Sequence, residues 1–577
     1  MEALISDKSA MDPEVVIPEE VGTAGGVSQA LWIGLPRSWA LAVFLAAGAS
    51  LSLWGPSTCL LGVIVAGLLA CLRGGCCGVQ RSSGGSWLCV LQRAASLGVL
   101  ACGVSASLQL RLVWLSQAPH VFSVAILLFL SLMFVLGLER SRLLRTALMV
   151  GMSTALLLLV SAVCLFYQPP LLQKLIQPSV TLSQVMECAA FFTMVFSGNS
   201  NKIPDRSVSL ASLLPVVILH LSTLITVAFL SIVVNDEKLH SGIFLISELK
   251  VETSGTVGRL VCDSLAVLAT LNLCLSLVEE MAESKRSVAA VAGVLLPAQI
   301  ARDSLLTGTQ LWTILISGAV SSLLVCLWSL PSLMMLVSVC CLLAHSCDLL
   351  SALYLTYQPV FVSKHAGEEV EGGGSYQLLS DTTQLVVSDS ELSDDSGHSS
   401  DTDIDAAVHE YRETIKVVAA TASPQEPTVS SARHATYSLL ALLVVSAGLG
   451  VALSHGYTYL PAFAVMEVLL FAYVMSRQPQ RSQNALSPWL PSAALSVEVM
   501  LASQLFPAQW SSLLLWSCTG LGFWLYNKRK YWFHLQSRAR SHVDRTKLRI
   551  DPHHRTTLSF LTSYRNLTHV DTVHVVR

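Results

Sequence analysis

Apolar runs long enough to cross a lipid bilayer recur along most of the chain, from about residue 38 to residue 532. A helix of about 20 apolar residues spans the hydrocarbon core of a membrane. Only 13% of the 577 residues are charged, about half the share that is typical of a soluble protein. The pattern predicts an all-α polytopic membrane protein with fourteen transmembrane helices, over residues 38–54, 56–72, 87–108, 121–138, 146–167, 183–198, 210–234, 260–278, 311–330, 332–357, 435–456, 460–476, 490–507 and 510–530.

Lysine and arginine gather in alternate connections between these runs, and this bias indicates the orientation. The connections on one side hold more basic residues than those on the other, and the C-terminal tail belongs to the basic side. We therefore expect both termini to be cytosolic. The basic side includes Arg73, Arg81, Arg140, Arg142, Arg145, Lys285, Arg286, Arg477, Lys528, Arg529 and Lys530.

Five regions follow from the spans. They are a cytosolic N-terminal tail (1–37), a ten-helix core (38–357), an acidic loop (358–433), four C-terminal helices (434–532) and a basic cytosolic tail (533–577). Within the core, residues 288–306 are apolar but contain Pro297, Arg302 and Asp303. We expect this segment to form a helix at the membrane surface or inside a cytosolic vestibule.

The acidic loop contains SDSELSDDSGHSSDTDIDAAVHE, which has many acids and no lysine or arginine. Such a segment cannot bury enough apolar surface to fold alone and is predicted to be disordered. Tyr376 and Leu379 bound the pattern Tyr-Gln-Leu-Leu, which is typical of peptides that sorting adaptors bind, although the same residues also suit a plain linker. We expect the plasma membrane or the membrane of endosomes or lysosomes, and a sorting role of Tyr376 would direct the protein to endosomes or lysosomes. Two serines before acidic residues are predicted phosphorylation sites: Ser393 and Ser400.

The sequence contains few features of an enzyme, a metalloprotein or a nucleic-acid-binding protein. No HExxH, GxSxG or P-loop pattern occurs, so an enzyme is not expected. The 15 cysteines lie mostly inside apolar runs without CxxC spacing, and a net charge of −3 comes with no basic recognition patch. We therefore predict no metal, no cofactor and no nucleic acid, and the partner that the composition does predict is the lipid bilayer.

Two segments carry a resemblance to a known family. Residues 486–530, beginning LSPWLPSAALSVEV, resemble the last two helices of cationic amino acid transporters, which belong to the amino acid–polyamine–organocation superfamily. Residues 307–359, ending Tyr-Gln-Pro, are similar to the ninth and tenth helices, and residues 55–69 to the second. The resemblance implies a divergent member whose first ten helices form two LeuT-like inverted repeats of five. It also implies a secondary transporter of amino acids such as arginine or lysine that works by alternating access.

In that family the first and sixth helices unwind at the membrane midplane, where freed backbone groups bind the substrate. The matching positions here are Gly48, Ala49 and Ser50 in the first helix, and Phe192, Ser197, Gly198 and Asn199 in the sixth. Of the family's glycine series only Gly48 remains, and alanine favours continuous helix. We expect a more continuous first helix than a working transporter has, with any kink confined to Gly48–Ser50. A transport-inactive homologue, acting as a sensor, regulator or trafficking partner, is the alternative function.

Charged side chains inside the spans are functional candidates, because charge in lipid is costly. Glu187 and Asp263 are candidates to line a path for a cationic substrate. The alternative is that these charges lie near the interfaces or pair across helices. The full set comprises Glu187, Asp263, Asp348, Glu467, Glu498 and Arg93.

Overall fold

The protein is an all-helical, multi-pass membrane protein. The computed structural model describes residues 35–75, 83–109, 119–137, 142–166, 180–196, 210–233, 256–293, 295–304, 308–358, 427, 429–457, 460–480 and 488–549. Within these residues the helices overlap every predicted span, and the only β-interaction is a bridge between Ala292 and Leu296. Eight of the described helices are long and apolar enough to cross a membrane, and five more are apolar but shorter. The predicted class is confirmed, while the total of fourteen spans stays a prediction.

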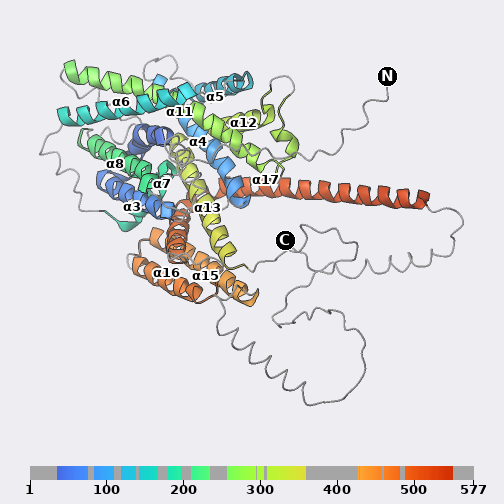
Figure 1. Cartoon of the computed structure of the whole chain (residues 1–577). Helices are drawn as coiled ribbons and strands as arrows, with labels where there is room; N and C mark the ends of the chain where they lie inside the picture. Colours follow the sequence, from blue (N-terminus) through green and yellow to red (C-terminus); the bar gives the residue numbers. More distant parts are fainter. Residues whose placement is uncertain are drawn as a thin grey trace, which may run out of the picture.

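The helices form one bundle, from which the last helix projects (Figure 1). The first helix runs from 35 to 54 and contains a π-helical stretch, η1 (Ala42–Ala46), followed by α2 (Ala47–Trp54). The others are α3 (Pro56–Gly75), α4 (Ser83–Gln109), α5 (Pro119–Val135), α6 (Arg142–Phe166), α7 (Leu182–Phe196), α8 (Leu210–Val233), α11 (Thr256–Val291), α12 (Leu311–Leu327), α13 (Leu330–Thr356), α15 (Val429–Ser454), α16 (Leu460–Ser476) and α17 (Trp489–Arg549).

Large apolar side chains cover the outer faces of the bundle. Phe129 is 64% exposed, Leu157 70% and Phe463 64%. A soluble protein rarely exposes such broad apolar surface, whereas lipid tails solvate it. The outward faces of α5, α6 and α16 therefore suit contact with lipid.

The first helix is the most buried part of the bundle. Its side chains from Leu35 to Leu51 are buried, and it packs against α3, α7 and α8. It ends at Gly55, whose φ of 78° lies in the left-handed region that glycine adopts at low cost. This turn connects the first helix directly to α3, which begins at Pro56.

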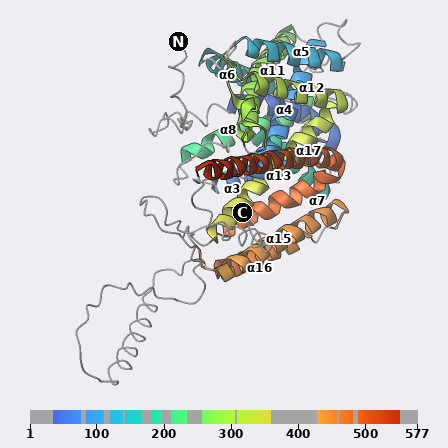
Figure 2. The same ribbon diagram turned by 90° about the vertical axis from the view of Figure 1, so that its right-hand side faces the viewer.

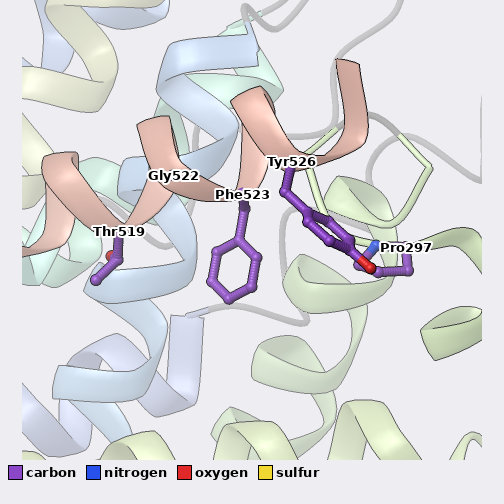
Figure 3. Close-up of a pocket in the computed structure, with 5 residues that line it drawn as sticks. All are labelled: Pro297, Thr519, Gly522, Phe523 and Tyr526. Carbon is purple, nitrogen blue, oxygen red and sulfur yellow. The ribbon is translucent and has the colours of Figure 1, made fainter. Parts of the chain in front are cut away.

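The expectation of a helix over 288–306 is wrong. Instead α11 continues to Val291, the chain turns at Gly293 (φ 92°), and a short 3-10 turn, η5 (Ala298–Ala301), follows Pro297. Proline has no N–H to continue a helical ladder, and glycine favours the turn. An apolar groove of about 450 Å³ lies between this turn and α17 (Figure 3).

The last predicted spans, 490–507 and 510–530, belong to one helix of 61 residues, α17, with Pro507 in its interior. Figures 1 and 2 show that α17 changes direction along its length. Proline commonly bends a membrane helix without ending it, because neighbouring helices and side chains satisfy the freed backbone. The helix continues to Arg549, into the predicted tail, and α15 begins at Val429, inside the predicted loop.

A buried ion pair and a tryptophan stack are among the contacts that join the ten-helix part to α17. Arg73 of α3 forms a buried ion pair with Glu498, which also accepts a hydrogen bond from Ser346 of α13 at 3.5 Å. Trp87 of α4 and Trp516 stack at 4.5 Å, and each indole N–H donates to the other's backbone carbonyl at 3.1 Å. The C-terminal helices are therefore fastened to the core by both charge and aromatic packing.

Tyr357, in the Tyr-Gln-Pro sequence after α13, fastens that end to α16 and the residues after it. Its hydroxyl donates to the backbone carbonyl of Met475 at 3.2 Å and accepts from Gln480 at 3.2 Å. One hydroxyl thus links the end of α13 both to α16 and to the residues that follow it.

Candidate functional site

The predicted substrate positions in the first helix lie in closed, buried helix. Gly48, Ala49 and Ser50 are buried, and the Ser50 hydroxyl donates to the carbonyl of Ala47 at 2.9 Å. Phe192 of α7 is also fully buried, and α2 packs against α7. No freed backbone group is present at these three positions of the first helix.

The irregularity in the first helix lies one turn earlier than expected. The π-helical stretch covers Ala42–Ala46, whereas any kink was predicted at Gly48–Ser50. A π-turn widens the ladder by one residue without breaking it and needs no glycine, so the glycine pattern could not indicate it. The remaining predicted residues lie outside the described part of the chain: Ser197, Gly198, Asn199, Tyr376, Leu379, Ser393 and Ser400.

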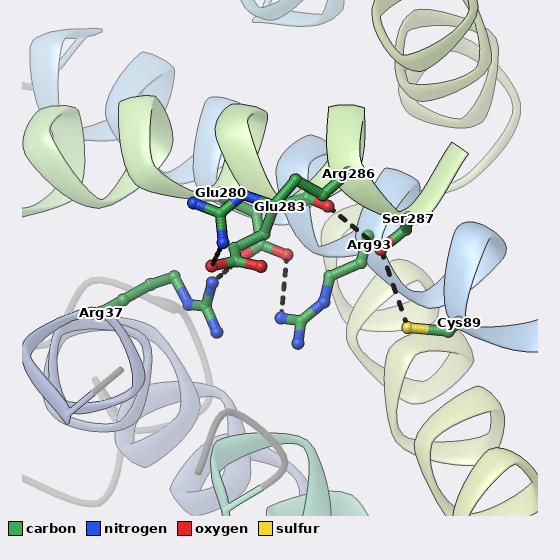
Figure 4. Close-up of polar contacts among 7 residues, drawn as sticks. All are labelled: Arg37, Cys89, Arg93, Glu280, Glu283, Arg286 and Ser287. Atoms are coloured by element: carbon green, nitrogen blue, oxygen red, sulfur yellow. Dashed lines mark hydrogen bonds and ion pairs between the residues drawn. The ribbon is translucent and has the colours of Figure 1, made fainter. Parts of the chain in front are cut away.

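A buried charge cluster holds the start of the first helix (Figure 4). Glu280 of α11 lies between two arginines. Its Oε2 is 3.0 Å from Arg37 Nη1 of the first helix, and its Oε1 is 3.4 Å from Arg93 Nη1 of α4. All three side chains are less than a tenth exposed. We call Arg37, Glu280 and Arg93 the arginine–glutamate cluster.

Antiparallel packing of α4 and α11 brings the cluster together. One turn from Arg93, Cys89 Sγ lies 3.9 Å from the Ser287 hydroxyl of α11. Farther out on α11, Arg286 and Glu283 form an ion pair at 3.2 Å, with Arg286 half exposed. The charge of Glu280 is thus buried between two arginines, whereas that of Arg286, less than two turns farther along α11, is half exposed.

A row of buried polar side chains runs along α11 and passes through the cluster at Glu280. Asn272, Ser276, Glu280 and Ser284 follow one another at four-residue spacing, and each is at most 1% exposed. The hydroxyls of Ser276 and Ser284 have no hydrogen-bond partner among the described residues. An ionisable side chain such as Glu280 inside a membrane bundle is a functional candidate by default. Figure 4 places Glu280 on the side of α11 that faces the first helix and α4.

The other end of the first helix is held by α7. Trp54 Nε1 donates to Glu187 Oε2 at 3.2 Å, and its ring lies 5.2 Å from that of Phe191. Glu187 is therefore a partner of the first helix here, as the pairing alternative predicted. The first helix is fastened at both ends by different neighbours, namely α4 with α11 at its start and α7 at its end.

Among the other predicted charges, pairing across helices is the common outcome. Arg93 and Glu498 sit in the ion pairs described above, and Glu467 of α16 accepts from the Ser446 hydroxyl of α15 at 2.8 Å. Asp263 lies exposed on α11, and Asp348 is half buried on α13. Neither of these aspartates joins the arginine–glutamate cluster.

Sequence reasoning missed Arg37 and Glu280 for one reason. The predicted spans began at 38 and ended at 278, so both residues fell just outside the apolar windows. The helix in fact continues through Glu279 and Glu280, and both carboxylates are buried. The four-residue spacing of polar residues from Asn272 was the available signal, since it indicates one helix face that passes through the acids.

Comparisons with known proteins assign no family. No family model matches the sequence, and no curated protein matches it. Solved structures of the manganese transporter of Eremococcus coleocola, among them single-substitution variants, align at 17% identity with a TM-score of 0.36, covering 59% of this chain and 82% of that one. A complex of that transporter with an aromatic bis-isothiourea substituted compound aligns with the same identity and score, over 59% and 81%. A TM-score at this level places the chain in no family.

Proposed function

We propose that the protein is a secondary transporter of amino acids, cationic ones such as arginine or lysine, that works by alternating access. The observation that carries the proposal is the double fastening of the first helix, by the arginine–glutamate cluster at its start and by Trp54 with Glu187 at its end. Alternating access requires a central helix that can be released on one side while it is held on the other. Two separate polar contacts at opposite ends supply such gates.

The pattern of helix contacts supports the repeat architecture. Numbered in order, the first helix contacts the sixth (α2 with α7), the second the seventh (α3 with α8), the third the eighth (α4 with α11) and the fourth the ninth (α5 with α12). Other contacts occur in matched pairs: α3 with α7 corresponds to α2 with α8, and α4 with α13 corresponds to α11 with α6. Two repeats of five helices related by a two-fold axis give this pattern.

The charges of the cluster support the substrate class. Glu280 holds the guanidinium of Arg37, and the same carboxylate can bind the guanidinium of arginine or the ammonium of lysine. Arg93 supplies a guanidinium that suits a substrate carboxylate. A cationic amino acid that displaces Arg37 from Glu280 would release the start of the first helix. Substrate binding would thereby open the gate at this end of the helix.

Uptake by purified protein in lipid vesicles tests the proposal. Labelled arginine and lysine should accumulate, and Glu280→Gln should abolish that uptake when equal amounts of folded protein are compared. Arg286→Gln, which removes an exposed charge from the same helix, is the matched control and should leave uptake unchanged. If Glu280→Gln takes up arginine and lysine at the wild-type rate, the arginine–glutamate cluster plays no part in transport.

A transport-inactive homologue is the second candidate, and the closed first helix favours it. Ala46–Ser50 offers no freed backbone and no ionisable side chain to hold a zwitterion. Folded protein that neither accumulates amino acids nor is stabilised against heat by arginine or lysine would favour this second candidate. The protein would then act as a sensor, regulator or trafficking partner through its acidic loop.

A further inference from the structure

We propose that the apolar groove beside α17 binds an acyl chain of an anionic phospholipid, whose headgroup lies at the basic end of that helix. The groove is lined by Pro297 from the turn after α11 and by Thr519, Gly522, Phe523 and Tyr526 from α17 (Figure 3). This site is separate from the proposed transport path and does not depend on transport.

The shape and chemistry of the groove suit a hydrocarbon chain. Its lining is almost wholly apolar, it opens to the outer surface, and its volume of about 450 Å³ is within the range of ligand pockets. A Cβ built at Gly522 would meet no other atom within 4 Å, so open space lies directly over this glycine. A larger side chain at this position would fill the space that the acyl chain needs.

Both walls of the groove are held in place without a ligand. The Asn527 amide donates to the backbone carbonyl of Leu295 at 2.6 Å, which fastens the turn to α17. Phe523 packs edge-on against Trp87, with ring centroids 6.3 Å apart, and Trp87 is itself stacked on Trp516. A preformed groove binds a flexible chain at a lower ordering cost than one that must assemble.

The charge at the end of the groove selects the headgroup. The apolar part of α17 ends at Lys528 and Arg529, both exposed and within one turn of Tyr526. The Lys528 ammonium lies 4.8 Å from the centre of the Trp524 ring, which places the aromatic ring and the cation side by side. Aromatic rings and basic side chains gather at the headgroup level of a bilayer. Each such cation attracts anionic lipid, so phosphatidylserine fits this end better than phosphatidylcholine.

A phosphatidylserine with a photoreactive group in one acyl chain tests the site on the full-length protein in phosphatidylcholine vesicles. We expect cross-links to map to 295–301 and 519–526 in the wild type. Gly522→Leu should reduce them by at least about tenfold, equivalent to roughly 1.4 kcal/mol of binding free energy. Gly448→Leu is the matched control, since Gly448 is an exposed helical glycine of α15 whose Cβ would also meet nothing within 4 Å.

The headgroup is tested separately. Lys528→Gln should reduce the preference for the phosphatidylserine probe over a phosphatidylcholine probe while cross-links still map to the groove. Equal labelling of wild-type protein by the two probes would overturn the anionic part of the proposal. Undiminished labelling of Gly522→Leu, or a photoreactive sterol that labels the groove in place of either phospholipid, would overturn the acyl-chain site itself.

Discussion

Replacement of Glu280 by glutamine should destabilise the protein far more than replacement of Arg37 by glutamine. Glu280 is 3.0 Å from Arg37 and 3.4 Å from Arg93. At an effective dielectric constant of about 20, these separations correspond to attractions of about 5.5 and 4.9 kcal/mol. Glu280→Gln loses both attractions and leaves two buried guanidinium groups without their carboxylate. Relief of the carboxylate's own desolvation offsets part of this, so we expect a net cost of about 3–5 kcal/mol, as for other broken buried pairs.

Arg37→Gln loses only one attraction and leaves the Arg93–Glu280 pair intact. The cost of burying the Arg37 charge disappears at the same time, and this desolvation is of similar size to the lost attraction. The single substitution should therefore be nearly neutral. The double variant Arg37→Gln/Glu280→Gln should be more stable than Glu280→Gln alone, because only one guanidinium is then left without a carboxylate.

Heating of the purified protein in detergent, followed by fluorescence-detected size-exclusion chromatography, measures these differences as apparent melting temperatures. The expected order is wild type close to Arg37→Gln, then the double variant, then Glu280→Gln. Arg286→Gln, on the exposed side of α11, is the control and should melt with the wild type. The reasoning fails if Glu280→Gln melts like the wild type, or if Arg37→Gln falls as far as Glu280→Gln.

Three further predictions concern other parts of the chain. Gly520→Ala should lower the melting temperature, because the new Cβ would lie 2.4 Å from Trp87 Nε1. Such overpacking costs roughly 1–3 kcal/mol. Gly522→Ala is the control and should leave the melting temperature unchanged, because its Cβ would meet only open space. Tyr357→Phe loses two hydrogen bonds at the end of α13 and should cost about 1–2 kcal/mol, measured by the same melting assay. Tyr376→Ala should move the protein away from endosomes or lysosomes in fluorescence imaging, and an unchanged distribution would exclude the sorting role.

The helical class was predictable because lipid leaves few choices to an apolar chain. Every backbone group must find a partner inside its own segment, so an apolar run of sufficient length becomes a helix. The same argument predicts the ends of the helices less accurately. The predicted span ended at residue 278, yet α11 continues through Glu280, for which Arg37 and Arg93 supply buried partners. Pro507 suggested a boundary, and the helix bends there and continues.

The candidate site was less predictable, because its partners come from distant parts of the sequence. The charge of Arg93 could be recognised inside a span, but its partner Glu280 lies 187 residues away. No periodicity within one helix indicates which face of another helix it meets. The unbroken helix at Gly48–Ser50 could be expected from the neighbouring alanines. The π-helical stretch at Ala42–Ala46 has no comparable signal in the sequence.

The ion pair between Arg73 and Glu498 also bears on how the protein is made. The two residues are 425 positions apart, so at 5–20 residues per second the ribosome needs roughly 20–85 s to synthesise the partner of Arg73. During that interval the arginine sits at the end of a newly inserted helix, with no carboxylate from α17 to accept its charge. Lipid phosphates, the insertion machinery or a chaperone must hold it meanwhile. Chains that stop before α17 are therefore expected to become substrates for membrane quality control.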